Sequence, residues 1–449
     1  MRNPNLRAIL VLSVLALQAM AVSEVAAGNV PASIHKASVE VRSAPDFNAS
    51  VVATLQRDAT ISVAGQQGMW FQVEMEGGKT GFVRVNDVRM AYAGKDGAAG
   101  VGALFSGKAG KGRVTETAGV RGLDESALRS AAYDGAQVAM LESYRATPDA
   151  AAALARDNGW EATPVAFAAE ARPGARGGST QAQKRGGLAA ARGVLSQIGG
   201  GLFGGRASEA MEVADASAGK SEDELAVQEL ELGPQLAGRI LGVVPLLADP
   251  QAQRRVNLIG HWMASQTTRP ELPWTFGVID SPEVNAFAAP GGYVLVTRGL
   301  SDLLADDAEV AAVLGHEISH VVQRDHYEVI RKQAITGTTQ DILARRVRVG
   351  DSLAAGMVTD YLRRNGAAVM LTSLDRDAEF RADQATEIYL ARSGSNPLAL
   401  YAVLQKMTSL SNESAALAQL YKTHPSLGDR LDQIDRRGLA GLEQYSRRD

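Results

Sequence analysis

The stretch His316-Glu317-Ile318-Ser319-His320 decides how this sequence is interpreted. It lies in residues 307–324, which are apolar on one face and contain no Gly or Pro except Gly315, a pattern that predicts a helix. Positions i and i+4 return to the same helix face, so His316 and His320 are expected to project side by side. Two neutral imidazoles in that arrangement can occupy two corners of a tetrahedral zinc site. Glu317 would then lie beside the metal, where it could take a proton from a water molecule.

The third ligand of such a site has to come from another part of the chain. Residues 374–383 predict a second helix, in which Glu379 and Asp383 are four apart and share a face. Glu379 could be the third protein ligand, which leaves the fourth position of one catalytic zinc ion per chain to water. Asp383 could accept the free N–H of a ligand imidazole or take part in a proton relay. The alternative is that both are acidic residues of an ordinary charged helix face.

The two helical motifs are accompanied by two further stretches, and together they resemble the M48 family of zinc metalloendopeptidases (gluzincin type). The stretches that carry this resemblance, besides the two helices, are Asn285-Ala-Phe-Ala-Ala-Pro-Gly-Gly292 within residues 280–300 and Thr423-His424-Pro425-Ser426 with Arg430. The resemblance covers residues 221–449. It implies that His316, His320 and Glu379 bind Zn²⁺, that Glu317 is the general base and that Asp383 is a proton donor.

His424 is the remaining candidate for a catalytic role. An N–H donor or cation near the metal would stabilise the oxyanion of a tetrahedral intermediate, and a late histidine could provide it or act as a gate. His-Pro also commonly marks a turn, here before a helix expected over residues 427–439. His35, His261 and His326 are expected to be structural or solvated.

The segments before the first motif predict a small sheet. Residues 274–280 and 293–297 have the composition of strands, and Ala289-Pro290-Gly291-Gly292 supplies a turn between them. A strand at the rim of this sheet could pair with an extended peptide substrate, although both strands could equally be core. Residues 221–449 are therefore expected to form a mainly helical, zincin-type catalytic domain with a small β-sheet, which begins at a capping box at Ser221.

The first 27 residues have the three regions of a secretory signal peptide. Cleavage could follow Ala27 or Ala21, and an uncleaved anchor is the alternative. The chain contains no cysteine, which excludes disulfides and a lipid-modified cysteine. No other run of about eighteen apolar residues occurs, so no integral membrane span is expected after signal removal. The prediction is a periplasmic protein, with membrane association left open. A net charge of −4 argues against a nucleic-acid partner.

Residues 28–93 predict a small all-β barrel. Short strand patterns recur about every ten residues, with a hairpin signal at Glu76-Gly77-Gly78-Lys79. This pattern, with Arg42-Ser43-x-Pro45, Trp70 and Gly81-Phe82-Val83, resembles the bacterial SH3 domain. Trp70 and Phe82 could line a groove for peptidoglycan or a peptide, but burial in the barrel is the favoured alternative. Residues 94–220 are expected to be a linker, with a helical segment at about 120–170 and a Gly-rich stretch at 172–206. The whole chain is thus expected to be α+β.

These observations predict an exported zinc endopeptidase that cleaves misfolded or unassembled envelope proteins. Two alternatives remain open at this stage. One is a periplasmic chaperone or adaptor with little or no proteolysis, and the other is a cell-wall hydrolase that the SH3-like domain directs to its substrate. Whether residues 333–370, between the two ligand motifs, form a lid over the site also stays open.

Overall fold

The computed structural model describes residues 29–91, 123, 125–165, 222–333, 365–410, 416–439 and 441–448. The expected signal peptide, the Gly-rich stretch 172–206 and residues 334–364 of the expected lid region lie outside these ranges. Among the described helices, none has both the length and the apolar character needed to cross a membrane.

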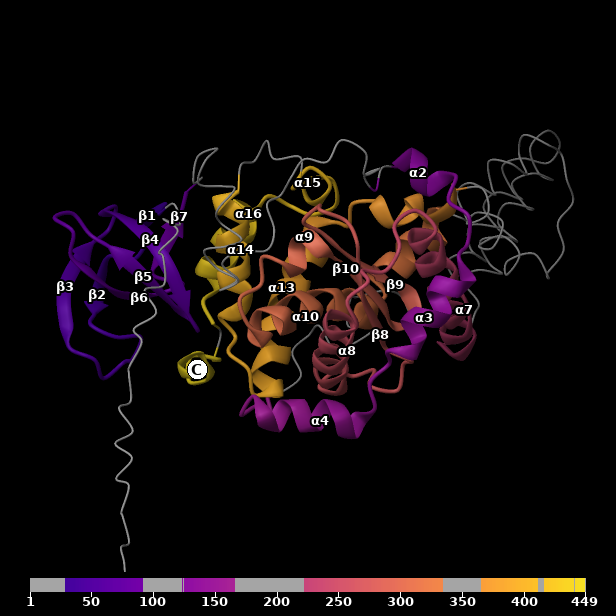
Figure 1. Cartoon of the computed structure of the whole chain (residues 1–449), viewed down its shortest axis with the longest axis horizontal. Helices are drawn as coiled ribbons and strands as arrows, with labels where there is room; N and C mark the ends of the chain where they lie inside the picture. The colour runs from indigo at the N-terminus through magenta and orange to yellow at the C-terminus, as the bar shows by residue number, and fades with distance from the viewer. Residues whose placement is uncertain are drawn as a thin grey trace, which may run out of the picture.

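An antiparallel sheet of seven strands forms the N-terminal domain at one end of the molecule (Figure 1). The strands are β1 (Val30–Ile34), β2 (Ser38–Arg42), β3 (Val51–Gln56), β4 (Thr60–Gln67), β5 (Trp70–Glu74), β6 (Thr80–Arg84) and β7 (Val88–Met90). Their order in the sheet is β3-β2-β6-β5-β4-β1-β7. This confirms the expected all-β domain, and it adds β1 and β7, which the sequence pattern did not indicate.

Alternation of apolar residues explains why these segments pair as strands. Val39 and Val41 of β2 are buried, whereas Ser38 and Glu40, which alternate with them along the strand, are exposed. Gly81 permits the close approach of β6 to β2, because a Cβ atom there would lie 2.5 Å from the Val41 side chain. The barrel core therefore follows from the period-two pattern.

The rest of the described chain is mainly helical, with a small sheet, as expected. The larger helices are α7 (Glu222–Leu241), α8 (Pro250–Ser265), α10 (Asp307–Gln323), α13 (Arg376–Ser393), α14 (Ala399–Ser409) and α16 (Leu427–Arg437). The short helical turns are α9 (Arg298–Ser301), η2 (Pro290–Gly292), η3 (Gly366–Leu371), α15 (Leu420–Thr423) and η4 (Tyr445–Arg447). The small sheet has the order β8-β10-β9, formed by β8 (Thr275–Ile279), β9 (Ala286–Ala289) and β10 (Tyr293–Thr297). β10 is parallel to β8 and antiparallel to β9, and β9 had not been expected as a strand.

Helix α10 lies at the centre of this domain and packs against α8, α13 and α14 (Figure 1). All its residues from Glu309 to Val322 are buried. Asp306 caps its first turn by accepting a hydrogen bond from the Glu309 amide at 2.9 Å. Gly315 allows α8 and α13 to approach, because a Cβ atom there would lie 3.2 Å from both Met263 and Thr386. The helix is thus enclosed on all sides, and its polar residues have to find partners inside the protein.

Three helices from the expected linker pack on the C-terminal domain. They are α2 (Glu125–Arg129), α3 (Gly135–Ser143) and α4 (Pro148–Asp157). Helix α4 starts at the Thr147-Pro148 pair, where the Thr147 hydroxyl accepts a hydrogen bond from the Ala150 amide at 3.3 Å. Helix α4 contacts α8, while α3 contacts α7 and β8. This part of the segment is therefore folded against the C-terminal domain.

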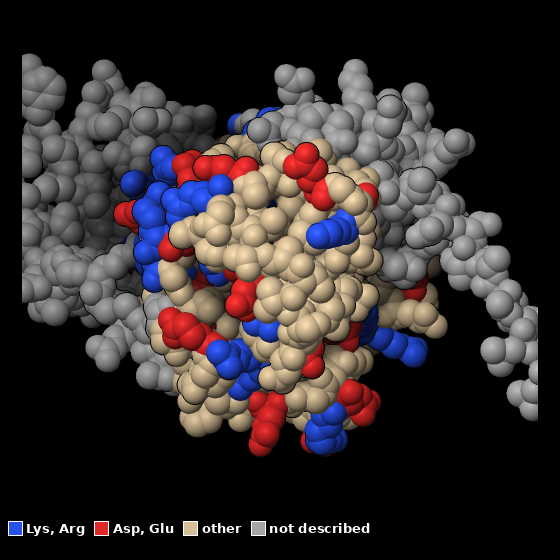
Figure 2. Space-filling view, turned by 90° about the vertical axis from the view of Figure 1, so that its left-hand side faces the viewer, with Lys and Arg blue, Asp and Glu red and all other residues tan. Residues whose placement is uncertain are grey.

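The N-terminal sheet is docked on the C-terminal domain through β7 and α14. The Gln405 side chain, fully buried on α14, accepts a hydrogen bond from the Met90 amide at 3.0 Å and donates one to the Val88 carbonyl. On the opposite, outward end of the sheet, β3 exposes Val51 and Val52. Figure 2 looks onto this end and shows a largely uncharged centre, with Lys and Arg gathered on one side.

Candidate metal centre

The candidate site residues come together at the middle of the C-terminal domain. Helix α10 supplies His316, Glu317 and His320, α13 supplies Glu379, and the chain between α15 and α16 supplies His424. One ligand atom from each of the three histidines and from Glu379 lies within 4.8 Å of all the others. Side chains about sixty and about a hundred positions apart in the sequence thus form one cluster. The two helical motifs led us to expect that His316, His320 and Glu379 would meet.

The distances in this cluster match a tetrahedral metal site. The Nε2 atoms of His316 and His320 are 3.2 Å apart. The Glu379 carboxylate lies 3.4 Å from His316 Nε2 through Oε2 and 3.7 Å from His320 Nε2 through Oε1. Ligands that bind zinc at about 2.0–2.1 Å in tetrahedral geometry are about 3.3–3.4 Å apart. The two imidazole nitrogens and the carboxylate oxygen nearest to each of them are therefore spaced about as the ligand atoms of a zinc site are.

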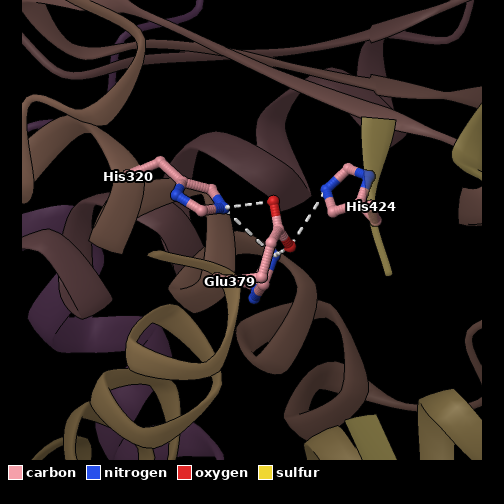
Figure 3. Close-up of side chains that lie close together, drawn as sticks. His320, Glu379 and His424 are labelled. Carbon is pink, nitrogen blue, oxygen red and sulfur yellow. Dashed lines mark hydrogen bonds and ion pairs between the residues drawn. The ribbon is translucent and has the colours of Figure 1, made fainter. Parts of the chain in front are cut away.

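The environment of Glu379 also requires a cation. This residue is fully buried, and within the described part of the chain both of its carboxylate oxygens lack a hydrogen-bond partner. Burial by itself would raise its pKa, but the neighbouring His424 and His316 lower it below the usual range. Figure 3 shows the carboxylate between the rings of His320 and His424. A buried carboxylate of this kind, beside two imidazoles, fits Zn²⁺ in both charge and donor type.

Both ligand imidazoles are held in place from behind by a carboxylate. His320 Nδ1 is 3.0 Å from Asp325 Oδ2, and His316 Nδ1 is 3.1 Å from an Asp383 oxygen. Each carboxylate can accept the Nδ1–H of its histidine, which leaves the lone pair of Nε2 directed into the cluster. The site is therefore preorganised for a metal ion.

Asp383 has a second partner, Arg430, which keeps its carboxylate ionised. Arg430 on α16 donates to both of its oxygens, at 3.0 Å from Nε and 2.5 Å from Nη2. Burial would raise the pKa of Asp383, but the Arg430 guanidinium lowers it to about 2. An aspartate that stays ionised is suited to orienting His316, which favours this role over that of a proton donor.

Glu317 lies beside the ligands and is only 4% exposed. Burial raises its pKa above the ordinary carboxylate value, while the two neighbouring histidines oppose this shift. A carboxylate with a raised pKa takes up a proton more readily at neutral pH. This environment would suit a general base.

His424 directs its Nε2 nitrogen toward the cluster, because its Nδ1 nitrogen contacts Thr423. Its Nδ1 is 2.8 Å from the Thr423 hydroxyl, which can itself donate to the Gln419 and Leu420 carbonyls at 3.2 Å. With that hydroxyl donating to a carbonyl, His424 Nδ1 donates to Thr423, and Nε2 keeps its lone pair 3.8 Å from Glu379 Oε2. Burial lowers the pKa of His424 to about 4, so the ring is neutral at neutral pH. This arrangement suits a fourth ligand better than a donor to an oxyanion.

Two residues near the cluster were not assigned this position from the sequence. Asp325 was not considered, although it follows α10 directly, after Arg324 turns the backbone at a φ of 59°. An acidic residue just past a helix that carries ligands was the available signal. The His326 ring lies 5.7 Å from that of His320, and burial lowers its pKa to about 3. The other two histidines lie away from the cluster, and His35 pairs with Asp435 at 3.0 Å.

Comparison with known families assigns both domains. Residues 250–438 match the family described as Peptidase family M48, and residues 37–88 match the bacterial SH3 domain. Both matches confirm the resemblances that the sequence motifs indicated.

Individual relatives match the same C-terminal part of the chain. A protein named beta-barrel assembly-enhancing protease, from Escherichia coli K12, is 29% identical over 206 residues, which are 45% of this chain and 42% of the relative. The mitochondrial metalloendopeptidase OMA1 of Arabidopsis thaliana is 32% identical over 34% of this chain and 30% of its own length. The metalloprotease LoiP of Escherichia coli K12 is 26% identical over 54% of this chain and 88% of its own length. The chain thus spans less than half the length of the beta-barrel assembly-enhancing protease.

Proposed function

Since the chain carries a peptidase family M48 domain behind a bacterial SH3 domain, we propose that it is an exported zinc-dependent endopeptidase that cleaves envelope proteins. The observation that carries this proposal is the Glu379 carboxylate, which is buried, has no hydrogen-bond donor among the described residues and faces two imidazole Nε2 atoms. His316, His320 and Glu379 would hold one Zn²⁺ ion. When bound, zinc supplies a Lewis acid that polarises the scissile carbonyl and lowers the pKa of water toward about 7.

The residues of this chain carry out the proton transfers around that centre. Glu317 takes the proton of the attacking water and passes it to the nitrogen of the leaving amine. The raised pKa of Glu317 brings its proton affinity closer to that of the water it has to deprotonate. Asp383 and Asp325 keep the two ligand imidazoles in one tautomer while the charge in the site changes.

His424 acts in this proposal as a gate. Its Nε2 lies where a substrate carbonyl or water would have to bind, so it closes the site as long as it stays there. His424→Ala is expected to retain zinc and to cleave casein at least as fast as the unsubstituted chain. A loss of cleavage of a hundredfold or more, with zinc retained, would instead assign His424 a direct role in catalysis.

An edge strand of the small sheet is the candidate site for an extended substrate. β9 is one of the two edge strands in the order β8-β10-β9, and it contacts α10, which carries the candidate ligand histidines. An extended peptide that adds to this edge would bind through backbone hydrogen bonds with little sequence preference. Unfolded or unassembled proteins offer such segments. The name of the E. coli relative associates that protein with β-barrel assembly, which supports misfolded or unassembled envelope proteins as the substrate class. The secretory signal pattern of the first 27 residues supports a periplasmic location.

Glu317→Gln tests this function. The amide keeps the shape of the side chain but cannot accept the proton, so zinc should remain bound while casein cleavage falls by at least a thousandfold. The same variant, expressed in cells, should retain uncleaved envelope proteins, which mass spectrometry can identify. If the zinc-loaded unsubstituted chain cleaves neither casein nor any envelope protein, the chaperone or adaptor alternative replaces the peptidase. Soluble fragments released from purified peptidoglycan, and lost in Glu317→Gln, would favour the cell-wall hydrolase.

A further inference from the structure

One face of the SH3 domain carries a cluster of Phe47, Trp70 and Arg84, referred to below as the arginine–aromatic cluster. The rings of Phe47 and Trp70 meet edge to face with centroids 5.0 Å apart. The Arg84 guanidinium lies 5.1 Å from the Phe47 centroid and 5.0 Å from that of Trp70. These contacts are one edge-to-face aromatic pair and two cation–π contacts, and both kinds of contact are stabilising.

The cluster has a buried polar group that the domain itself does not satisfy. Trp70 is 3% exposed, and its indole N–H has no acceptor in the part of the chain that the structure describes. A buried indole N–H normally finds a partner. Residues 445–448 do not pair with this N–H either, so a bound peptide with an acceptor at this position would gain one more hydrogen bond.

A segment from the other end of the chain occupies this cluster. The Ser446 carbonyl in η4 accepts a hydrogen bond from Arg84 Nη2. The guanidinium of the next residue, Arg447, lies 5.3 Å from the Phe47 ring centroid. The SH3 domain therefore receives a backbone carbonyl and an arginine side chain from one short segment.

The same segment is anchored to the C-terminal domain on its other side. Asn396 donates to the Ser446 carbonyl at 3.0 Å, so this oxygen accepts from both domains. Arg448 donates to the Ala391 carbonyl at 2.7 Å and to the Thr163 hydroxyl at 2.9 Å. Residues 445–448 thus link the SH3 domain to the C-terminal domain.

We propose that the arginine–aromatic cluster is a peptide-binding site for arginine-bearing segments, and that residues 445–448 of this chain are its resident ligand. The Arg84 guanidinium selects a backbone carbonyl, and the Phe47 ring selects the adjacent arginine side chain. A peptide of the same kind binds only where the resident segment has left the cluster. This proposal is independent of peptide-bond cleavage and concerns only the SH3 domain and its ligand.

The test is a binding measurement on a chain that ends at Glu443. The probe is a fluorescently labelled peptide of residues 444–449, Gln-Tyr-Ser-Arg-Arg-Asp, whose binding is followed by anisotropy. The shortened chain should bind this peptide at least tenfold more tightly than the full chain, in which the resident segment competes. Replacing Arg447 by Ala in the peptide should weaken binding about two- to fivefold, as expected for an exposed cation–π contact.

Substitutions in the shortened chain locate the binding site. Phe47→Leu and Arg84→Gln should each weaken peptide binding, whereas Val52→Thr on the exposed strand β3 should not. Equal binding by the full and shortened chains would overturn the proposal. So would unchanged binding in Phe47→Leu and Arg84→Gln, because the segment would then be held by the C-terminal domain alone.

A measurement on the full chain covers the case in which the shortened chain does not fold. Hydrogen–deuterium exchange of residues 445–448 should be faster in Phe47→Leu and in Arg447→Ala than in the unsubstituted chain. Val52→Thr is again the control and should leave this exchange unchanged. Identical exchange in all four proteins would contradict the proposal.

Discussion

Helix α10 carries two clusters of buried charge, and they differ in how well their polar atoms are satisfied. Near its start, the fully buried Glu309 accepts from Lys406 Nζ at 2.6 Å and from the Ala305 amide at 2.6 Å through one oxygen. Its other oxygen accepts from Gln66 of the SH3 domain at 2.8 Å. Further along the helix, Glu379 meets His316 and His320, but neither of its oxygens has a hydrogen-bond donor in the described part of the chain.

This difference separates a structural cluster from a binding site. Burial of a charge is costly in both places, and at Glu309 the cost is offset by a cation and two further donors. At Glu379 the described part of the chain provides no such compensation, and the neighbouring nitrogen atoms are donors that could bind a metal ion together with this carboxylate. The comparison teaches that unsatisfied buried charge, rather than buried charge alone, marks the functional site.

The largest effect is expected from removing the charge of Glu379. Glu379→Gln should lower zinc affinity roughly a thousandfold, because one of three protein ligands that share a binding free energy of about 10–16 kcal/mol is weakened. Competition with a zinc chelator measures the change. Glu387→Gln is the matched control, since Glu387 is also buried on α13 but pairs with Arg437 outside the cluster. Equal loss of zinc in both variants would contradict the assignment of Glu379.

A substitution in the cluster of Glu309 and Lys406 should lower the stability of the fold and leave metal binding unchanged. Lys406→Met leaves Glu309 buried without its cation, which is expected to cost about 3–5 kcal/mol of unfolding free energy. Urea denaturation measures this loss, while zinc stoichiometry should stay unchanged. Lys79→Met, at an exposed turn, is the control and should have little effect. A Lys406→Met chain that is as stable as the unsubstituted one would show that the two clusters do not differ as described.

A smaller loss of zinc affinity is expected when the substituted residue only contacts a candidate ligand and does not itself bind the metal. Asp325→Asn removes the carboxylate behind His320, and such changes lower metal affinity about 10- to 100-fold. The same chelator competition detects it. Asp280→Asn, which affects only the surface pair with Arg298, is the matched control. If Asp325→Asn binds zinc as tightly as this control, the carboxylate does not hold the His320 ring for metal binding.

Local patterns explain why the candidate ligands could be singled out from the sequence. His316 and His320, and likewise Glu379 and Asp383, are one helical turn apart, and helix periodicity is a property of the sequence itself. Asp325 could not be placed in this way, because its direction depends on the left-handed turn at Arg324. Contacts between distant segments could not be predicted either. Gln66, for example, is 243 residues from Glu309, and no periodicity in the sequence relates the two.

The same reasoning applies to the fold. The alternating strands β2 to β6 of the SH3 domain and the helices α10 and α13 were indicated by their periods, whereas the apolar strand β9 has no alternation that would reveal it. The packing of α3 and α4 on the C-terminal domain depends on tertiary contacts, such as that of Leu141 with β8 at Gly277.

X-ray absorption at the zinc edge tests the central claim most directly. The full chain, loaded with one equivalent of zinc, should show a shell of imidazole nitrogens and carboxylate oxygen at about 2.0–2.1 Å, as expected for these donors. The Glu317→Gln chain should give the same spectrum. A spectrum without imidazole scattering, or zinc that is removed by gel filtration, would contradict a metal site at His316, His320 and Glu379.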